Sequence, residues 1–281
     1  MKNLLTYLKE RFPLPMVGVL AGITAMFLVA IVQPDSKDLN DHLTTLAIAI
    51  GFLFFMLRTR VTDEFKDSKH DNQNYPNRPV QRGIISRRTL VVIGITALIL
   101  EIGAVFWAAS LQANLSSVLF YGLVLGYSVL TAFEFFASNF LDKHFNIYLI
   151  VHQAIFILYP IWIFNLFGIQ ITNTAIPAVA AFILFLLLIE IVRKYELRHN
   201  PAGVLVMDTY LAVWRGGAFW VIFAISSLAP IALFSYFGSI WLFVISAVSG
   251  LSLLILRTHN ERVRAIAALT FIATGLVIYF S

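Results

Sequence analysis

The chain has 281 residues, of which 59% are hydrophobic and only 12% are charged. This apolar share exceeds that of a typical soluble domain and indicates an integral membrane protein. Cysteine is absent, which excludes disulfide bonds, thiolate nucleophiles and zinc–cysteine sites. Lys and Arg outnumber Asp and Glu by 20 to 15, an excess that reflects topology in a membrane protein, so we expect no nucleic-acid partner.

The first 15 residues are basic, and we interpret them as the start of an uncleaved first helix because no small-residue cleavage site follows. Apolar stretches then recur along the chain, each near the ~20 residues needed to cross the hydrocarbon core. We predict nine spans, near residues 16–32, 42–57, 90–109, 115–133, 146–167, 175–191, 216–229, 236–256 and 263–280. The seventh is the least clear, since Pro230 and the residues after it could extend it. The predicted fold is therefore all-α, with one domain over residues 1–281.

The distribution of basic residues predicts the orientation. With nine spans and a cytoplasmic N-terminus, every Lys and Arg except Lys37 lies in a cytoplasmic segment or, like Arg264, at the cytoplasmic end of a span. The long polar loops at residues 58–89 and 192–215 then share the cytoplasmic side, and the C-terminus lies on the opposite side. In a bacterium, the membrane would be the inner or plasma membrane.

The most polar stretch of the chain is residues 63–86. Its carboxylates Asp63, Asp67 and Asp71 recur every four residues and would project from one helix face, with Glu64 alongside. Four neighbouring acids repel one another unless a cation lies among them, and hard oxygen ligands suit Mg²⁺. Basic residues are interspersed or follow directly, namely Lys66, Lys69, Arg78 and Arg82. Acids for a metal beside bases for phosphate oxygens predict a metal-diphosphate site, the alternative being a solvated loop.

A second charged segment follows the sixth predicted helix. Glu190 lies at its end, and Glu196 follows; both could complete a metal site across a central cavity. Nearby bases would act as phosphate clamps, namely Arg193, Lys194 and Arg198. The alternative is a helix exit whose basic side chains extend to lipid headgroups. By itself this segment favours that alternative, because its pattern is less specific than the first.

Glu101 falls near the middle of the third predicted span, where a carboxylate is costly and by default indicates a functional site. Two uses are open. The side chain could bind an acceptor hydroxyl or take a proton, or it could be protonated and hydrogen-bonded to a neighbouring helix.

The first segment resembles the signature of the UbiA-type intramembrane prenyltransferases, which is Asn-Asp-x-x-Asp-x-x-x-Asp followed by Asn-Arg-Pro-x-x-x-Gly-x-x-Ser/Thr. This chain has Asp63-Glu64-x-x-Asp67-x-x-x-Asp71 and then Asn77-Arg78-Pro79-x-x-x-Gly83-x-x-Ser86. Two positions differ from the family, Asp63 for Asn and Glu64 for Asp, and both keep oxygen ligands. The family's second motif is a pair of aspartates about four residues apart, where this chain has Glu190 and Lys194.

The resemblance implies about nine helices around a central cavity, with a cytoplasmic cap formed by loops 2–3 and 6–7. It also implies Mg²⁺-dependent transfer of an isoprenyl group from a polyprenyl diphosphate to a hydrophobic or aromatic acceptor within the membrane lipid. The implied metal ligands are Asp63, Glu64, Asp67, Asp71, Glu190 and Glu196. The implied catalytic residues are Asp63, Lys66, Asp67 and Glu190, and the implied diphosphate contacts are Arg78, Lys143, Arg193, Lys194 and Arg198. An aromatic-rich cavity would shield the allylic cation from water.

Two other functions are compatible with the residues. A UbiA-like membrane terpene cyclase would use the same site on an isoprenyl diphosphate without an acceptor. A transporter for a divalent cation or small molecule would use the acids as a binding site, but transporter sites lie near the bilayer midplane and these acids lie at a helix end.

Overall fold

A computed structural model describes residues 2–34 and 38–281 of the chain. Within these residues the structure has fourteen α-helices and one short 3-10 helix, and no strand beyond an isolated bridge between His199 and Leu205. The predicted all-α fold class is therefore confirmed. Lys37, the basic residue predicted on the far side of the membrane, lies outside the described residues.

Seven helical stretches are long and apolar enough to cross a membrane within the described residues. They are α2 (Leu14–Val32), α3 (Leu39–Lys66), α5 (Arg87–Leu111), α8 and α9 together (Phe145–Leu166), α10 (Ile176–Arg193), α12 (Gly216–Phe237) and α14 (Asn260–Phe280). Two shorter apolar helices, α6 (Ser117–Ala132) and α13 (Trp241–Leu256), match the remaining predicted spans. Each predicted apolar stretch is thus helical over most of its length, while nine membrane crossings remain a prediction.

The boundary between the seventh and eighth predicted spans was wrong. Helix α12 continues through Pro230 to Phe237 and ends at Gly238, whose φ of 67° is the left-handed conformation that commonly closes a helix. Helix α13 begins at Trp241 rather than at residue 236. The fifth predicted span is divided into α8 (Phe145–Gln153) and α9 (Ile155–Leu166) at Ala154.

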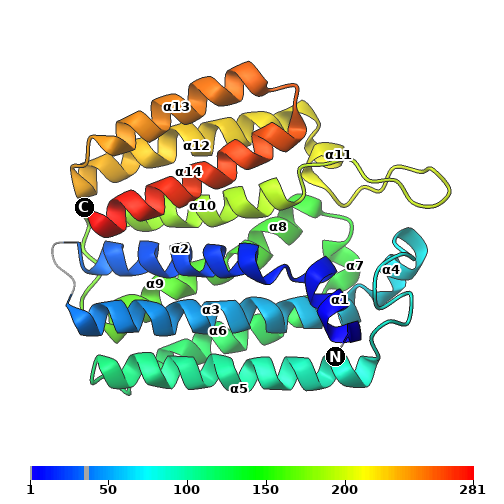
Figure 1. The fold of residues 1–281 in the computed structure, drawn as a ribbon, viewed down its shortest axis with the longest axis horizontal. Helices are drawn as coiled ribbons and strands as arrows, with labels where there is room; N and C mark the ends of the chain where they lie inside the picture. Colours follow the sequence, from blue (N-terminus) through cyan, green and yellow to red (C-terminus); the bar gives the residue numbers. More distant parts are fainter. Residues whose placement is uncertain (1, 35–37) are drawn as a thin grey trace. The chain divides into compact units, whose positions relative to one another are not determined.

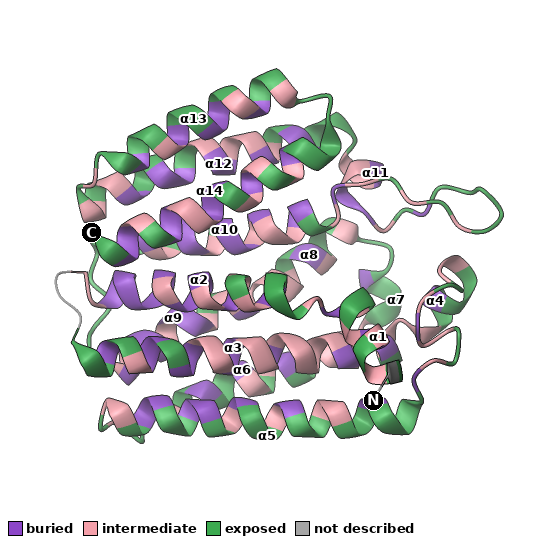
Figure 2. Ribbon diagram, viewed as in Figure 1, coloured by how far each residue is buried: buried purple, intermediate pink, exposed green. Residues whose placement is uncertain are grey.

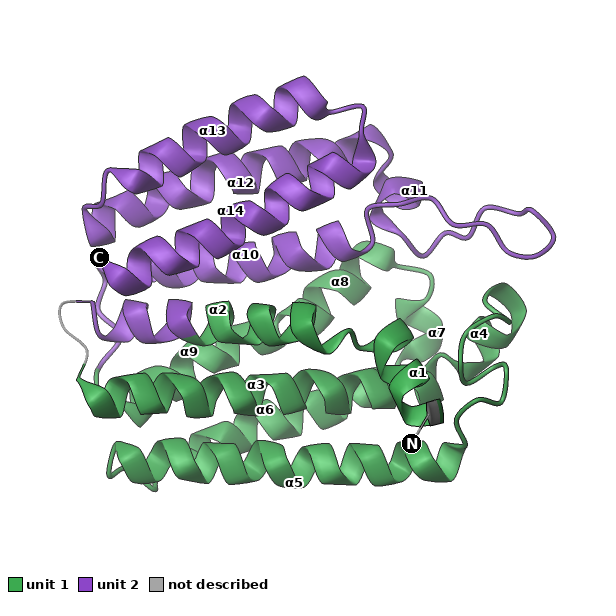
Figure 3. Ribbon diagram, viewed as in Figure 1, with its two compact units in different colours: residues 1–25, 38–169 green, residues 26–37, 170–281 purple. Residues whose placement is uncertain are grey.

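The chain forms two compact units, shown in different colours in Figure 3. Unit 1 comprises residues 1–25 and 38–169, and unit 2 comprises residues 26–37 and 170–281. Helix α2 contributes residues to both units. The single domain over residues 1–281 and the central cavity with its cytoplasmic cap stay predictions.

In unit 1, helix α3 packs along α5, and α6 packs against α9 (Figure 1). The start of α3 is fixed by a capping box, in which the side chains of Asp38 and Asp41 each accept a hydrogen bond from the other's backbone N–H. The two long helices are close at Gly51, where a Cβ would lie 3.6 Å from the Cβ of Ala104, an ordinary van der Waals distance. An aromatic core lies between the helices, formed by Phe52, Phe55, Tyr121, Tyr159 and Trp162.

Four shorter helical segments complete unit 1. They are α1 (Lys2–Arg11), α4 (Ser68–Asn74), the 3-10 helix η1 (Glu134–Phe136) and α7 (Ser138–Leu141).

Unit 2 is built from α10, α12, α13 and α14, with the short helix α11 (Tyr210–Trp214). Its core contains Phe27 of α2, whose ring centroid lies 5.6 Å from those of Phe182 and Phe185 and 6.1 Å from that of Phe271. Helices α12 and α13 approach closely at Gly250, where a Cβ would lie 2.8 Å from the Oγ of Ser227. Such close contact at small residues is typical of helix packing in membranes.

The outward surfaces of both units are apolar as well as their cores. Figure 2 shows exposed residues recurring along α5 and α13. On α5 the exposed side chains include Val92, Ile95 and Ile99, which are 54–64% exposed and lie three or four residues apart. Their spacing places them on one helix face, which suits contact with lipid tails.

Candidate active site

The predicted acidic segment lies where the apolar helix α3 ends. Helix α3 extends through Asp63 and Glu64 to Lys66, Asp67 follows as its last capping residue, and α4 then contains Asp71. The helical bonding pattern continues across the junction, because the backbone N–H of Asp67 donates to the carbonyl of Asp63, and that of Asp71 donates to Asp67, both at 2.8 Å. The three aspartates therefore follow one another at one-turn intervals, as their spacing predicts.

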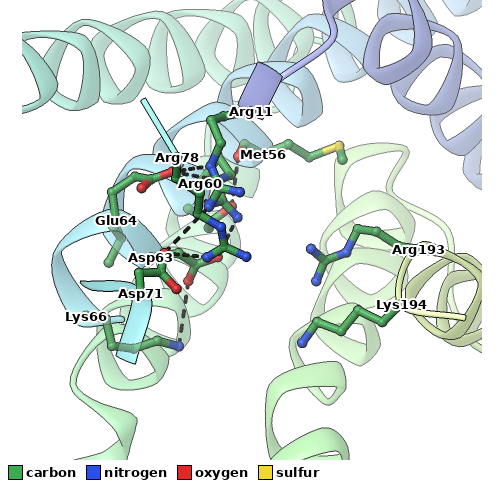
Figure 4. A network of polar contacts seen from close by, with 12 residues as sticks. Arg11, Met56, Arg60, Asp63, Glu64, Lys66, Asp71, Arg78, Arg193 and Lys194 are labelled. Atoms are coloured by element: carbon green, nitrogen blue, oxygen red, sulfur yellow. Dashed lines mark hydrogen bonds and ion pairs between the residues drawn. The ribbon is translucent and has the colours of Figure 1, made fainter. Parts of the chain in front are cut away.

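Glu64 is neutralised by two arginines. Its buried Oε1 accepts hydrogen bonds from Arg11 Nε at 2.8 Å and from Arg60 Nη2 at 2.7 Å (Figure 4). Arg11 comes from α1, 53 residues earlier in the chain. The second oxygen of Glu64 is buried and has no hydrogen-bond partner among the described residues.

Asp71 is held in a similar way by Arg78 of the Asn77-Arg78-Pro79 sequence. Arg78 forms an ion pair with Asp71 and stacks on the ring of Tyr75, with its guanidinium carbon 3.8 Å from the ring centroid. His70 Nδ1 lies 3.6 Å from the same carboxylate. Burial disfavours the charged form of Asp71, but the neighbouring His70 ring and the charge of Arg78 outweigh it and lower the pKa.

Asp63 and Asp67 are less completely paired. The side chain of Asp63 is 38% exposed, and its oxygens lie 3.6 Å from Lys66 Nζ and 4.0 Å from Arg60 Nη1. In the described part of the chain, the partly buried carboxylate of Asp67 has no hydrogen bond and no ion pair within 4 Å. Burial, followed by repulsion from Asp63, raises the pKa of Asp67 to about 6. A carboxylate in this situation gains stability from any cation that binds beside it.

Lys66 extends the cluster toward η1 and α8. Its ammonium group donates to the Tyr148 hydroxyl at 3.0 Å and lies 3.8 Å from Glu134. Burial raises the pKa of Glu134, an effect that the charge of Lys66 opposes. Tyr148 and Glu134 were missed by sequence reasoning, because Tyr148 is 82 residues from Lys66 and lies in an ordinary apolar stretch.

The N-terminal helix α1 is a further part of the site that sequence reasoning missed, because its bases were interpreted only as topology signals. Besides Arg11 bonding to Glu64, Glu10 accepts two hydrogen bonds from Arg82, each at 2.7 Å. The buried ring of Tyr7 packs in an apolar cluster with Ile85. Helix α1 therefore fixes the segment between α4 and α5 against the end of α3.

In unit 2, the predicted acids are paired with the neighbouring bases. Glu190 contacts Arg193 Nη2 at 2.8 Å, Lys194 Nζ at 3.6 Å and the Tyr210 hydroxyl at 3.3 Å. Glu196 forms ion pairs with Arg198 and Arg264. In unit 1, Lys143 is exposed in the turn after α7. The roles of these residues as metal ligands or diphosphate contacts stay predictions, as does a joint site with the Asp63 segment.

The donor atoms fit Mg²⁺ in a restricted sense. Among the described residues, no group of three acidic, histidine or cysteine side chains is placed to hold a metal by itself. Arginines hold Glu64 and Asp71, which leaves Asp63, Asp67 and the unpartnered oxygen of Glu64. Mg²⁺ usually binds through one or two carboxylates together with substrate phosphates, so this set suits an ion that arrives with a diphosphate better than a closed protein cage.

Glu101 belongs to a different network, within the membrane-spanning part of unit 1. It is fully buried, and its oxygens accept hydrogen bonds from Arg58 Nε at 2.7 Å, Arg58 Nη2 at 2.9 Å and the Tyr121 hydroxyl at 2.7 Å. Glu101 therefore bonds to neighbouring helices, as one of its two predicted uses required. Its main partner is a guanidinium group, which contacts the carboxylate through two hydrogen bonds.

Comparison with known proteins places this arrangement in a known fold. No protein-family model and no curated protein sequence matches the chain. A solved structure of a digeranylgeranylglyceryl phosphate synthase in membranes does match, covering 99% of this chain and 100% of its own. The TM-score is 0.52 and the sequence identity is 17%. The chain shares its fold with this synthase.

The shared fold and the apolar helices together show that the chain is an integral membrane protein. At 17% identity the likeness concerns the fold alone, so the chemistry of the chain has to be argued from its own residues. The orientation in the membrane stays a prediction from the basic residues.

Proposed function

We propose that the chain is a Mg²⁺-dependent prenyltransferase, which moves an isoprenyl group from a polyprenyl diphosphate to a lipophilic or aromatic acceptor within the membrane. The observation that supports this most directly is Asp67, a partly buried carboxylate without an ion-pair partner in the described chain, next to Asp63 at the end of a membrane-spanning helix. The shared fold supports it as well, because the name of the synthase describes a product with two geranylgeranyl groups on glyceryl phosphate.

The charges around Asp67 favour the binding of a cation. The linked cluster has more acids than permanently charged bases, five carboxylates against four cationic side chains among the described residues. The carboxylates are those of Asp63, Glu64, Asp67, Asp71 and Glu134, and the cationic groups are those of Arg11, Arg60, Lys66 and Arg78. A divalent cation and a diphosphate would bring opposite charges together, which the mixed cluster can accommodate.

The proposed reaction begins when the C–O bond between the isoprenyl C1 and the diphosphate breaks, and the electron pair leaves with the diphosphate. A nucleophilic atom of the acceptor then bonds to the allylic cation and loses a proton. When bound, Mg²⁺ would neutralise charge that develops on the leaving group. Asp63 and Asp67 would hold the metal, and Lys66, oriented by its hydrogen bond to Tyr148, would stabilise the diphosphate oxygens. The apolar helices would exclude water from the cation.

The test is diphosphate release from purified protein given geranyl, farnesyl or geranylgeranyl diphosphate, with and without Mg²⁺. Wild type is compared with Asp67→Asn, and Glu261→Gln is the matched control because the Glu261 side chain is 83% exposed at the start of α14. We expect Mg²⁺-dependent release by wild type and by the control, and its loss in Asp67→Asn. Absence of release with every donor, from folded protein, would refute the proposal.

Product analysis separates the proposal from its alternatives. A membrane lipid extract and glyceryl phosphate lipids are supplied as acceptors. A prenyltransferase forms a product whose mass includes the acceptor, whereas a terpene cyclase forms a hydrocarbon or alcohol from the donor alone. Cation flux into liposomes without diphosphate release would indicate a transporter.

We further propose that the N-terminus and both polar loops face the cytoplasm, as the basic residues predict.

A further inference from the structure

Tyr148, which hydrogen-bonds to Lys66, begins a row of side chains along one face of α8 in unit 1. His152 follows four residues later and lies on the same helix face, whereas Ile150 between them is 67% exposed on the opposite face. The rings of Tyr148 and His152 stack, with their centroids 3.9 Å apart. Because the Tyr148 hydroxyl accepts from Lys66 at 3.0 Å, the imidazole of His152 is one aromatic ring removed from the ammonium group.

Beyond His152 the chain continues into the aromatic core of unit 1. Phe156 follows four residues later, and its ring centroid lies 6.2 Å from those of Phe52 and Tyr159. His152 thus lies between the charged end of α3 and the aromatic side chains.

An isoprenyl diphosphate has the same division into a charged and an apolar part, and its reactive carbon C1 lies where the two parts join. A donor whose diphosphate is at Lys66 and whose chain runs toward the aromatic side chains would place C1 near His152. The position of His152 therefore suits a group that acts on the atoms around C1.

The bonding of the imidazole determines which of its nitrogens can take a proton. Nδ1 of His152 lies 2.9 Å from the backbone carbonyl oxygen of Tyr148. A carbonyl oxygen only accepts hydrogen bonds, so Nδ1 has the hydrogen, and Nε2 of the neutral ring has the lone pair. The bond fixes the tautomer and holds the partly buried ring in one orientation.

The residue after His152 provides a second polar group. Helix α8 ends at Gln153, and Tyr127 of α6 donates to the carbonyl of Val151 at 2.8 Å, which fixes this end of the helix. The side-chain oxygen of Gln153 is buried and has no hydrogen-bond partner among the described residues. Buried polar atoms in native proteins are nearly always paired, so this oxygen indicates room for an O–H or N–H group from outside the chain.

We propose that His152 is the base that takes the proton from a hydroxyl group of the prenyl acceptor. This inference rests on the proposed prenyl transfer and adds to it the class of acceptor, one whose nucleophile is a hydroxyl oxygen. Gln153 accepts a hydrogen bond from a second polar group of the same acceptor.

The step that His152 performs follows the ionisation of the donor. A lone pair of the acceptor oxygen forms the bond to C1 of the isoprenyl cation. The O–H bond breaks, its electron pair stays on the oxygen, and the proton passes to Nε2 of His152. The imidazolium then gives this proton to the released diphosphate, which restores the neutral ring. The sum is an ether of the acceptor and a singly protonated diphosphate.

The test measures ionisation and transfer separately in one reaction. Purified protein is given geranylgeranyl diphosphate, Mg²⁺ and a membrane lipid extract. Diphosphate release reports ionisation, and a product whose mass includes an acceptor reports transfer. Wild type is compared with His152→Gln.

The matched control is His144→Gln, at a histidine with the same local bonding. His144 also stacks on the ring four residues before it, that of Phe140, and its Nδ1 lies 2.8 Å from the carbonyl of that residue. Its side chain differs in being exposed.

In His152→Gln we expect the amount of adduct per diphosphate released to fall about 100-fold, as loss of a general base typically causes, with prenyl alcohol formed instead. His144→Gln should keep the wild-type ratio. An unchanged ratio in His152→Gln would overturn the assignment of His152 and leave the proposed prenyl transfer intact. Absence of release or of any adduct with wild type would overturn both.

A second variant, His152→Ala, decides the question if size-exclusion chromatography shows that His152→Gln is misfolded. Imidazole added to His152→Ala should restore adduct formation, because it supplies the missing base in the space of the lost side chain. A loss of adduct that imidazole does not restore would assign His152 to packing and overturn the proposal.

Discussion

Helix α3 contributes to two carboxylate clusters in unit 1 that are built differently. In the first cluster, Arg58 of α3 meets Glu101 of α5, and Tyr121 completes the bonding, so a fully buried acid faces one largely buried base. At the end of the same helix, acids outnumber permanently charged bases, and Asp67 has no ion-pair partner among the described residues. The first cluster is closed, and the second is open to an additional cation.

The difference follows from what each cluster can contact. Glu101 is buried away from water, where an unpaired charge is very costly, so Glu101 and Arg58 have to satisfy each other. At the helix end a carboxylate can take up a proton or a metal ion instead. The complete pairing of Glu101 is therefore a structural requirement. The incomplete pairing of the second cluster leaves room for a ligand.

The largest expected effect is on stability, at the closed cluster. Glu101→Ala leaves the guanidinium of Arg58 buried without its partner and should lower the free energy of unfolding by about 3–5 kcal/mol. Thermal melting in detergent measures this as a lower Tm. The double variant Arg58→Met/Glu101→Leu should recover most of the loss, because it removes both charges. If the double variant is as unstable as Glu101→Ala, the unpaired charge of Arg58 is not the cause of the lost stability.

In the open cluster, a substitution should reduce activity without reducing stability. We expect Asp67→Asn to reduce Mg²⁺-dependent diphosphate release by about 100-fold, as removal of one group that stabilises a transition state typically does. Its Tm should equal or exceed that of wild type, because the substitution removes an unpaired, partly buried negative charge. Lower stability together with unchanged activity would mean that Asp67 is structural and would contradict the comparison.

Arg11 tests whether helix α1 holds the open cluster together. Arg11→Gln removes a charge-assisted bond to buried Glu64 and should cost about 1.5–3 kcal/mol. Hydrogen exchange should rise mainly in residues 75–86, which α1 contacts. The matched control is Arg82→Gln, which breaks a more exposed pair with Glu10 and should cost only about 0–1 kcal/mol. Equal effects of the two variants would argue against a special role for the Glu64 contact.

The smallest expected effect is the pH dependence due to Asp67. Its pKa is about 6 in the folded protein against 3.8 for an ordinary aspartate, so the folded state holds the proton more tightly than the unfolded state. Without Mg²⁺, the contribution of Asp67 to stability should therefore decrease as the pH rises from about 4 through 6. Melting curves of wild type and Asp67→Asn should accordingly diverge over this range, with wild type becoming relatively less stable. If the Tm values of the two proteins change in parallel with pH, Asp67 does not have a raised pKa in the folded protein.

The pH dependence of Mg²⁺ binding should report the ionisation of the same carboxylate, that of Asp67. The metal requires the ionised carboxylate, so the Mg²⁺ concentration for half-maximal activity should rise by up to about tenfold per pH unit below 6.

Much of the fold was predictable because membrane-spanning helices are local features. Apolar stretches of sufficient length form helices in lipid whatever their neighbours are, so every predicted stretch is helical over most of its length. The error at the start of α13 has a local cause as well. Pro230 and the apolar residues after it were compatible with either a break or a continuation, and in the structure the helix continues and packs against α10 and α13.

The amino-acid sequence alone determined the membrane class, the helical stretches, and the one-turn spacing of Asp63, Asp67 and Asp71. Only the tertiary structure decided which acids are already neutralised. Glu64 bonds to Arg11 across 53 residues, and Glu101 bonds to Arg58 across 43. Spacing along a chain fixes which side chains share a helix face, but ion pairing depends on which helices meet, and that is decided when the apolar surfaces of the whole unit pack.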